Sequence, residues 1–225
     1  MDDAELFAAV RRELFVAAVG DVLDRMGLQH QFVGPELRVI EPHMVILGRA
    51  MPVLEADFCG VSNTGLGPLG KKPFGLMFEA LDDLKPGEVY ICAGASPRYA
   101  LWGGLMTTRA LACGAAGAVV HGYHRDTHEI LRLDFPIASF GSYAQDQGVR
   151  GKVIDWRVPI EMDGVRINPG DIVYGDRDGV LIVPSDAAAE AFAGAFEKVR
   201  AENTVLEALQ AGMSTVDAFK TFGVM

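Results

Sequence analysis

The segment of this chain richest in chemically active side chains is 121–130, with the sequence HGYHRDTHEI. Three of the five histidines, one arginine and two carboxylates fall in it, directly after the apolar run AAGAVV. Histidine and aspartate can bind a metal ion, arginine can bind an anion, and histidine can transfer protons near neutral pH. The segment therefore predicts a metal site, an anion site or a histidine-based catalytic cluster, unless it is only a polar loop after a buried strand.

Arg125 and Asp126 offer the clearest chemistry in this segment. An arginine can hold a carboxylate or an enolate oxygen, and an aspartate can bind a hard divalent cation. Neighbours within a strand point to opposite faces, whereas in a loop just past the strand both can face one cleft. In many proteins the same dipeptide is only an exposed ion pair of little energetic value.

A second candidate lies about twenty residues earlier, in WGGLMTTRAL. Gly103 and Gly104 open a predicted helix, so the amides of Leu105 and Met106 could bind a small carboxylate at the positive end of the helix dipole. The alternative is that the two glycines only allow close packing. In a layered α/β fold a helix N-terminus and the end of the next parallel strand share one sheet edge, where ligands bind.

The histidines allow a third kind of site. His124, Asp126 and His128 would share one face of a strand, which suits a transition metal. Thr127, however, is predicted to cap a helix that begins at His128, and this breaks the alternation. His30 and His43 are isolated and are expected to be structural or surface residues.

Composition excludes several classes of protein. The chain has 225 residues, a net charge of -10 and no basic cluster larger than Lys71-Lys72, so we expect no binding to nucleic acid. The cysteines, Cys59, Cys92 and Cys113, form no Cys-x-x-Cys pair, which favours free thiols and a cytoplasmic protein. The acidic, amphipathic N-terminus does not resemble a signal peptide, and no apolar run reaches the roughly 20 residues of a membrane span.

The elements that must position these residues follow from periodicity and turn signals. The sequence has no internal repeat, low-complexity tract or clean linker, so a single α/β domain over residues 1–225 is expected, with a β-rich meander at 152–184 and a loop at 60–75. Predicted helices are 3–18, 22–27 after Asp21, 76–84, 103–114, 127–134, and 185–210 capped by Ser185; predicted strands are 44–56, 88–94, 118–122 and 135–140.

Several stretches together resemble the RraA-like family, which includes the 4-hydroxy-4-methyl-2-oxoglutarate aldolases. They are GDVLDRMG, GGLMTTRALACGAAGAVVHGYHRD, FPIASFGSYAQDQGVRGKV, INPGDIVYGDRDGVLIVP and the C-terminal tail from AENTVLEAL onward. The resemblance implies a β/β/α swivelling-domain fold, assembled as a homotrimer or homohexamer with active sites between subunits.

The same resemblance implies roles for individual residues. In the aldolases a divalent cation, Mg²⁺ or Mn²⁺, binds near the residue matching Asp126, and the match of Arg125 stabilises an enolate oxygen. The amides of Leu105 and Met106 would take the substrate carboxylate, and Glu202 from a neighbouring subunit's C-terminal helix would hold the metal's waters. The implied activity is a metal-dependent lyase that cleaves or decarboxylates a small 2-oxo or hydroxy acid.

Two positions depart from the family pattern. The aldolases carry an acidic residue where this chain has Gly104, and the family usually has aspartate where this chain has His121. His121 and His124 could take over proton transfer. Two alternatives remain: a non-catalytic regulator that binds a ribonuclease, and a transition-metal site formed by His121, His124, Asp126 and His128.

Overall fold

A computed structural model describes residues 2–58 and 68–223, which form two compact units, His30–Ser185 and Met1–Gln29 with Asp186–Met225. Cys59 and residues 60–67 of the predicted loop lie outside the described residues. Among the described helices, none has the length and apolar character that crossing a membrane requires.

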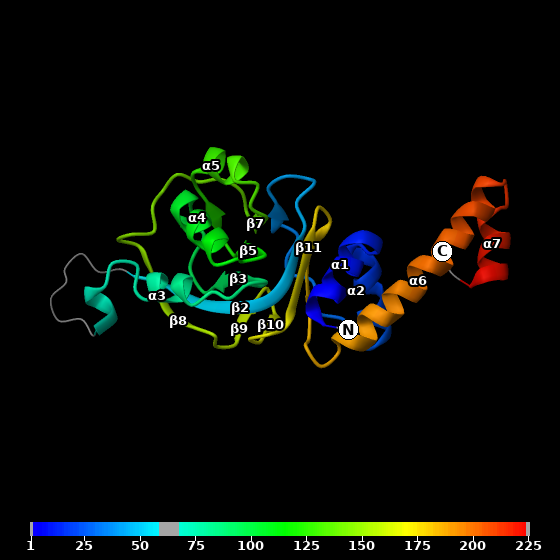
Figure 1. Cartoon of the computed structure of the whole chain (residues 1–225), viewed down its shortest axis with the longest axis horizontal. Helices are drawn as coiled ribbons and strands as arrows, with labels where there is room; N and C mark the ends of the chain where they lie inside the picture. Colours follow the sequence, from blue (N-terminus) through cyan, green and yellow to red (C-terminus); the bar gives the residue numbers. More distant parts are fainter. Residues whose placement is uncertain (1, 59–67, 224–225) are drawn as a thin grey trace. The chain divides into compact units, whose positions relative to one another are not determined.

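The unit His30–Ser185 is built around an eight-stranded sheet (Figure 1). Its strands and those of two smaller sheets are β1 (Arg38–Val39), β2 (Ile46–Asp57), β3 (Glu88–Ala93), β4 (Ala100–Trp102), β5 (Gly117–Val120), β6 (Tyr123–His124), β7 (Ile137–Ser139), β8 (Gly151–Trp156), β9 (Ile160–Met162), β10 (Val165–Ile167), β11 (Ile172–Asp176) and β12 (Gly179–Val183). Its helices are the 3-10 turn η1 (Pro68–Lys71), α3 (Met77–Asp82), α4 (Gly104–Ala112) and α5 (Thr127–Arg132).

The centre of the sheet is parallel, in the order β7-β5-β3-β2, and antiparallel strands flank it. The outer strands are β1 beside β7, and β11 followed by β12 beside β2, with β8 also paired to β2. Helices α3, α4 and α5 connect the parallel strands, as the alternation of strands and helices predicts. They lie on one face of the sheet, and the β9–β10 hairpin lies on the other (Figure 1).

Alternation along each strand divides the apolar residues between two cores. On β3, Tyr90 and Cys92 belong to the core beneath the helices, whereas Val89 and Ile91 belong to the core shared with the β9–β10 hairpin. Tyr90 also packs against Trp102 of β4, with ring centroids 5.1 Å apart. Burial on both faces explains why the central strands are almost continuously apolar.

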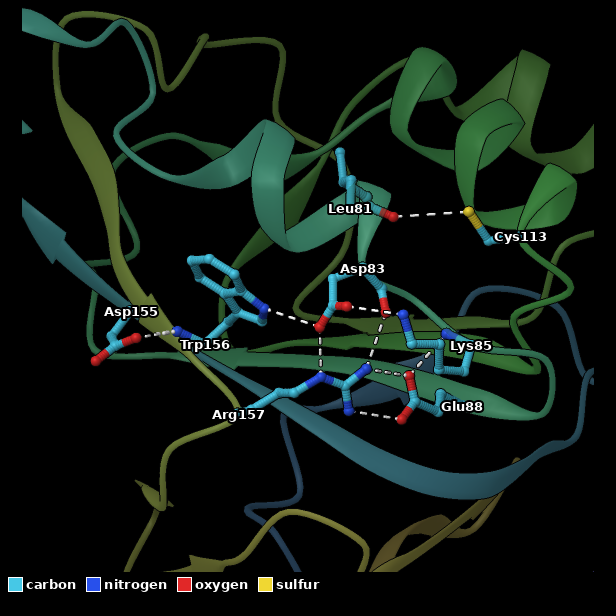
Figure 2. A network of polar contacts seen from close by, with 8 residues as sticks. All are labelled: Leu81, Asp83, Lys85, Glu88, Cys113, Asp155, Trp156 and Arg157. Carbon is cyan, nitrogen blue, oxygen red and sulfur yellow. Dashed lines mark hydrogen bonds and ion pairs between the residues drawn. The ribbon is translucent and has the colours of Figure 1, made fainter.

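Arg157, just after β8, ties three parts of this unit together (Figure 2). Its guanidinium donates to Asp83 Oδ2 at 2.5 Å, beyond the end of α3, and to Glu88 Oε1 at 2.7 Å, at the start of β3. Trp156 Nε1 donates to the same Asp83 oxygen at 3.1 Å. These bonds hold the pKa of Asp83 well below its usual value and raise the pKa of Arg157, so the pair stays charged.

The other unit contains four helices, α1 (Asp3–Glu13), α2 (Val16–Arg25), α6 (Ala188–Gln210) and α7 (Thr215–Phe222). Helices α2 and α6 approach closely at Gly194, where a Cβ atom would lie only 2.9 Å from Val22 Cγ1. Lys198 bridges them with an ion pair to Asp21 Oδ2 at 3.1 Å, and it also pairs with Glu202 on its own helix.

Three predicted helix boundaries in this unit are wrong. The helix expected at 3–18 ends at Glu13, because Leu14 and Phe15 are extended, and Asp21 lies inside α2 instead of preceding a helix. Ser185 does not cap α6, which begins at Ala188. Its amide instead donates to Asp171 Oδ1 at 3.0 Å, so a tertiary hydrogen bond replaces the local capping that the residue type suggests.

Candidate active site

Two short parallel strands bring the predicted site residues together. β4 pairs with β6 in a separate two-stranded sheet, so the residues that follow each strand meet at one edge. Gly103 and Gly104 follow β4, and Arg125 and Asp126 follow β6. The Arg125 amide donates to the Trp102 carbonyl at 2.9 Å and fixes this arrangement. The shared edge was predicted, but it belongs to this small sheet and not to the main one.

Asp126 occupies an unusual backbone position at the start of α5. It is the N-cap residue and has a φ of 58°, in the left-handed region that aspartate tolerates better than most residues. Its carboxylate does not cap its own helix; its Oδ2 accepts the amide of Gly104, at the start of α4, at 3.1 Å. The prediction that Thr127 caps this helix is therefore wrong, because Thr127 is its first residue.

The two glycines at the start of α4 leave room for this contact. A Cβ atom on Gly103 would lie only 2.9 Å from Asp126 Oδ2. The amides of Leu105 and Met106 follow in the first turn, and no carbonyl or side chain among the described residues accepts from them. Two donors at the positive end of a helix dipole are thus available to a ligand, and their binding of a small carboxylate stays a prediction.

Arg125 is held between two carboxylates. Its Nη1 lies 3.0 Å from Asp146 Oδ1, and its Nε lies 3.9 Å from Asp126 Oδ2. The side chain of Arg125 is 39% exposed, so the guanidinium can still contact a ligand. Asp146 was not identified from the sequence. It lies in a loop after β7, and only its place in the FPIASFGSYAQDQGVRGKV stretch pointed to it.

These residues line a cavity of about 500 Å³. Its wall is mainly apolar and combines α3, α4, β4 and nearby loops. The lining residues are Phe74, Met77, Phe78, Leu81, Asp82, Ala100, Leu101, Trp102, Gly103, Leu105, Met106, Arg109, Arg125, Asp126, Asp146 and Gln147. Of the predicted site residues, Gly103, Leu105, Met106, Arg125 and Asp126 therefore meet at one cavity, and Gly104 joins them through its amide.

The predicted catalytic histidines do not line this cavity. His124 is buried, and its two ring nitrogens lie 2.7 Å from Ser139 Oγ and 3.0 Å from Thr127 Oγ1. Burial lowers the pKa of His124, which favours the neutral ring. His121 Nε2 lies 3.0 Å from Asp163 Oδ1, in the turn between β9 and β10. Both histidines therefore bind other parts of the chain in this structure.

Glu202 lies on α6, in the unit of helices, where Lys198 donates to its carboxylate. Its predicted place is at the site of a neighbouring subunit, so this role stays a prediction. His128, in the first turn of α5, is exposed.

The sequence profile of the RraA-like family, described as Aldolase/RraA, matches residues 16–182. This chain belongs to the RraA-like family. Protein DlpA of Legionella pneumophila is 38% identical over 90 residues, which cover 40% of this chain and 15% of DlpA. The 4-hydroxy-4-methyl-2-oxoglutarate aldolase of Thermus thermophilus is 33% identical over 111 residues, which cover 48% of this chain and 66% of the aldolase. This chain thus spans less than two thirds of the length of these two relatives.

The predicted RraA-like α/β fold is confirmed by comparison with solved structures. The structure of an uncharacterized protein from Pseudomonas syringae pv. tomato superposes with a TM-score of 0.83 and 26% sequence identity. The superposition covers 98% of this chain and 95% of that protein.

At the first departure from the RraA-like pattern, Glu129 of α5 packs over Gly104. A Cβ atom on Gly104 would lie 3.1 Å from Glu129 Cγ. The Glu129 carboxylate is held by Arg132, with Oε2 accepting from Nε at 2.9 Å, so it does not replace the acidic residue expected at position 104. The carboxylate that contacts the start of α4 is therefore that of Asp126, the N-cap residue of α5.

Membership of the RraA-like family raises the question of a metal. Among residues 2–58 and 68–223, no group of three or more His, Cys, Asp or Glu side chains could hold an ion. The four-residue transition-metal site is therefore not assembled in the described part of the chain. Magnesium needs less, because it keeps several waters and binds through one or two carboxylates. Asp126 fits such a water-rich site, since the described hydrogen bonds engage only its Oδ2.

A buried acid lies behind the cavity and was missed in the sequence. Gln147, which lines the cavity, donates to Glu55 Oε2 at 2.8 Å. Glu55 is 2% exposed, and burial raises its pKa to about 8, so it is mainly a neutral acid at pH 7. The sequence did carry a signal for this buried position. Side chains alternate between the two faces of a strand, so Glu55 lies on the same face as the core residues Met51 and Val53.

Proposed function

We propose that this chain is a lyase that releases pyruvate from a small 2-oxo or hydroxy acid, by retro-aldol cleavage or by decarboxylation. One observation carries the proposal: the Arg125 guanidinium, the Asp126 carboxylate and the first free amides of α4 meet at one cavity. Both reactions leave an electron pair beside a carbonyl carbon. Both therefore need a positive group where the enolate oxygen develops.

The residues divide this work as follows. The amides of Leu105 and Met106 bind the substrate carboxylate at the start of α4. Arg125 then contacts the 2-oxo oxygen and stabilises its growing negative charge. Asp126 orients the site by accepting from Gly104 and facing Arg125.

Proton transfer in the retro-aldol reaction uses a water that Asp126 holds. Its side chain is 46% exposed, so solvent reaches it. The water accepts the proton of the C4 hydroxyl as the C3–C4 bond breaks, and a proton is later returned to C3. His121 and His124 act as positioning residues for the segment between β5 and α5, since each makes a hydrogen bond to a side chain elsewhere in the chain.

A divalent cation, Mg²⁺ or Mn²⁺, would be held by Asp126 and would supply Lewis-acid charge at the oxygens of the pyruvyl group. In a homotrimer or homohexamer, Glu202 of a neighbouring copy would bind the waters of that cation. The proposal thus keeps the C-terminal helices in the role that the family resemblance implies.

The test is pyruvate release from oxaloacetate and from 4-hydroxy-4-methyl-2-oxoglutarate with added Mg²⁺. We expect Arg125→Lys to lower kcat/KM by about 100-fold, because lysine cannot reproduce the planar contact to the oxyanion. The matched control is Arg166→Lys, an exposed arginine of β10 outside the cavity, which should change kcat/KM less than about twofold. Equal losses in the two variants would contradict the proposal.

The alternative is a regulator that binds a protein partner, because the matching family profile covers both aldolases and RraA. The exposed apolar rim of the cavity favours it, since Leu105 is 87% and Phe78 is 55% exposed. Neither Mg²⁺ nor pyruvate would then raise the melting temperature. A rise with Mg²⁺ and a further rise with pyruvate would support the lyase instead.

A further inference from the structure

The cavity extends from the proposed catalytic group toward an apolar wall that pyruvate does not need. Its volume of about 500 Å³ falls within the roughly 300–1,000 Å³ typical of sites for much larger ligands. The extra space must accommodate the part of the substrate that leaves as the second product. The inference below rests on the proposed lyase function. The chemical character of this wall indicates what the leaving part of the substrate is.

The wall is lined by aromatic and thioether side chains. Phe74 and Phe78 pack edge to face, with ring centroids 5.8 Å apart and an interplanar angle of 72°. Met77 and Met106 also line the cavity. Methionine sulfur and aromatic edges both make favourable contacts with an aromatic ring. A planar, apolar group therefore fits this wall better than a charged one.

Among the described lining residues, each arginine faces an aspartate, so a second carboxylate on the substrate would have to compete with one of these acids. The cavity has two arginines, Arg109 and Arg125, and three aspartates, Asp82, Asp126 and Asp146. Each arginine is already paired, Arg109 Nε with Asp82 Oδ1 at 2.7 Å and Arg125 Nη1 with Asp146 Oδ1 at 3.0 Å.

The position of the Arg109–Asp82 pair fits the leaving part of the substrate. Arg109 is five residues after Gly104 on α4, which is about 7.5 Å along the helix axis. A substrate whose carboxylate sits at the start of α4 would thus direct its C4 substituent along Met106 toward this pair and Phe78. A carboxylate on C4 would approach the negative charge of Asp82 there and would compete with it for Arg109.

We infer that the substrate is a 4-hydroxy-2-oxo acid with a single carboxylate and an aryl group on C4. Cleavage breaks the C3–C4 bond, and its electron pair moves to C3 and forms the pyruvate enolate. The C4 hydroxyl loses its proton and becomes the carbonyl of an aromatic aldehyde. The enolate then takes up a proton at C3, so no oxidant or reductant is required.

The test compares 4-hydroxy-2-oxo-4-phenylbutanoate with 4-hydroxy-4-methyl-2-oxoglutarate, by pyruvate release with Mg²⁺. We expect kcat/KM to be at least about tenfold higher for the aryl substrate. Phe78→Ala should lower this preference about tenfold, whereas Phe32→Ala, a similarly exposed phenylalanine outside the cavity, should leave it unchanged. Asp82→Asn frees Arg109 and should shift the preference toward the dicarboxylate by about tenfold.

A wild-type preference for the dicarboxylate, or a preference that Asp82→Asn does not change, would overturn the inference. Exchange of the pyruvate methyl protons in heavy water reports enolate formation alone. Exchange without an aryl preference would remove this inference and leave the proposed function. If neither exchange nor cleavage is seen, the proposed function fails, and calorimetry then measures which ligand the cavity binds. Stronger binding of phenylpyruvate than of 2-oxoglutarate, weakened by Phe78→Ala, would support the aryl site. Equal binding of the two ligands would overturn it.

Discussion

Replacing the buried Glu55 by glutamine tests how burial couples stability to pH. Burial raises the pKa of this carboxyl from 4.5 to about 8. The unfolded chain loses the proton near pH 4.5, whereas the folded chain keeps it until about pH 8. The free energy of unfolding of the wild type should therefore fall as the pH rises between these values. One pKa unit corresponds to about 1.4 kcal/mol, so the full decrease is about 5 kcal/mol.

The assay is urea unfolding of the wild type and Glu55→Gln from pH 4.5 to 9. Glutamine can still accept from Gln147 but has no proton to lose. The stability difference, wild type minus variant, should thus decrease by about 5 kcal/mol across this range. Glu161→Gln, at an exposed position of β9, is the matched control and should leave the wild-type slope unchanged. Parallel curves for the wild type and Glu55→Gln, within about 1 kcal/mol, would refute burial as the cause.

Three further changes test the site and its support. Gly103→Ala should lower kcat/KM at least about tenfold with little loss of stability, because the new methyl group displaces the Asp126 carboxylate; kinetics and thermal melting measure both. His124→Ala should lower the free energy of unfolding by about 2 kcal/mol, since it removes a buried ring together with its hydrogen bonds to Ser139 and Thr127; unchanged urea unfolding would contradict this. Arg157→Ala should cost about 2 kcal/mol at pH 7. That cost should shrink as the pH falls below 3.8, because the depressed pKa of Asp83 stabilises the fold only while the carboxyl is ionised in the folded state.

The part of the site that could be predicted comes from two stretches with strong local signals. The glycines of WGGLMTTRAL do start a helix, and Arg125-Asp126 does follow a strand end. Because strand pairing was expected to be parallel, the two were expected at one edge, and they meet there. The residues that were missed, Asp146, Gln147 and Glu55, lie in other segments and join the site only through long-range contacts.

The histidines show the opposite case. Their density in HGYHRDTHEI suggested catalysis or metal binding, but residue type does not reveal which partners a ring nitrogen meets. In the folded chain His124 meets Ser139, and His121 meets Asp163, both far away in the sequence. These contacts account for both side chains without a ligand.

The sequence by itself determined the α/β class, the family, and the adjacency of an anion-binding helix start to an Arg-Asp pair. Periodicity, glycine positions and charge act over a few neighbouring residues, so they can be read along the chain. Only the tertiary structure decided that the cavity wall is aromatic, that Asp82 and Asp146 pair with its arginines, and that burial raises the pKa of Glu55. Burial and pairing depend on segments that fold together from distant parts of the chain, and these set the charge and shape that a substrate meets.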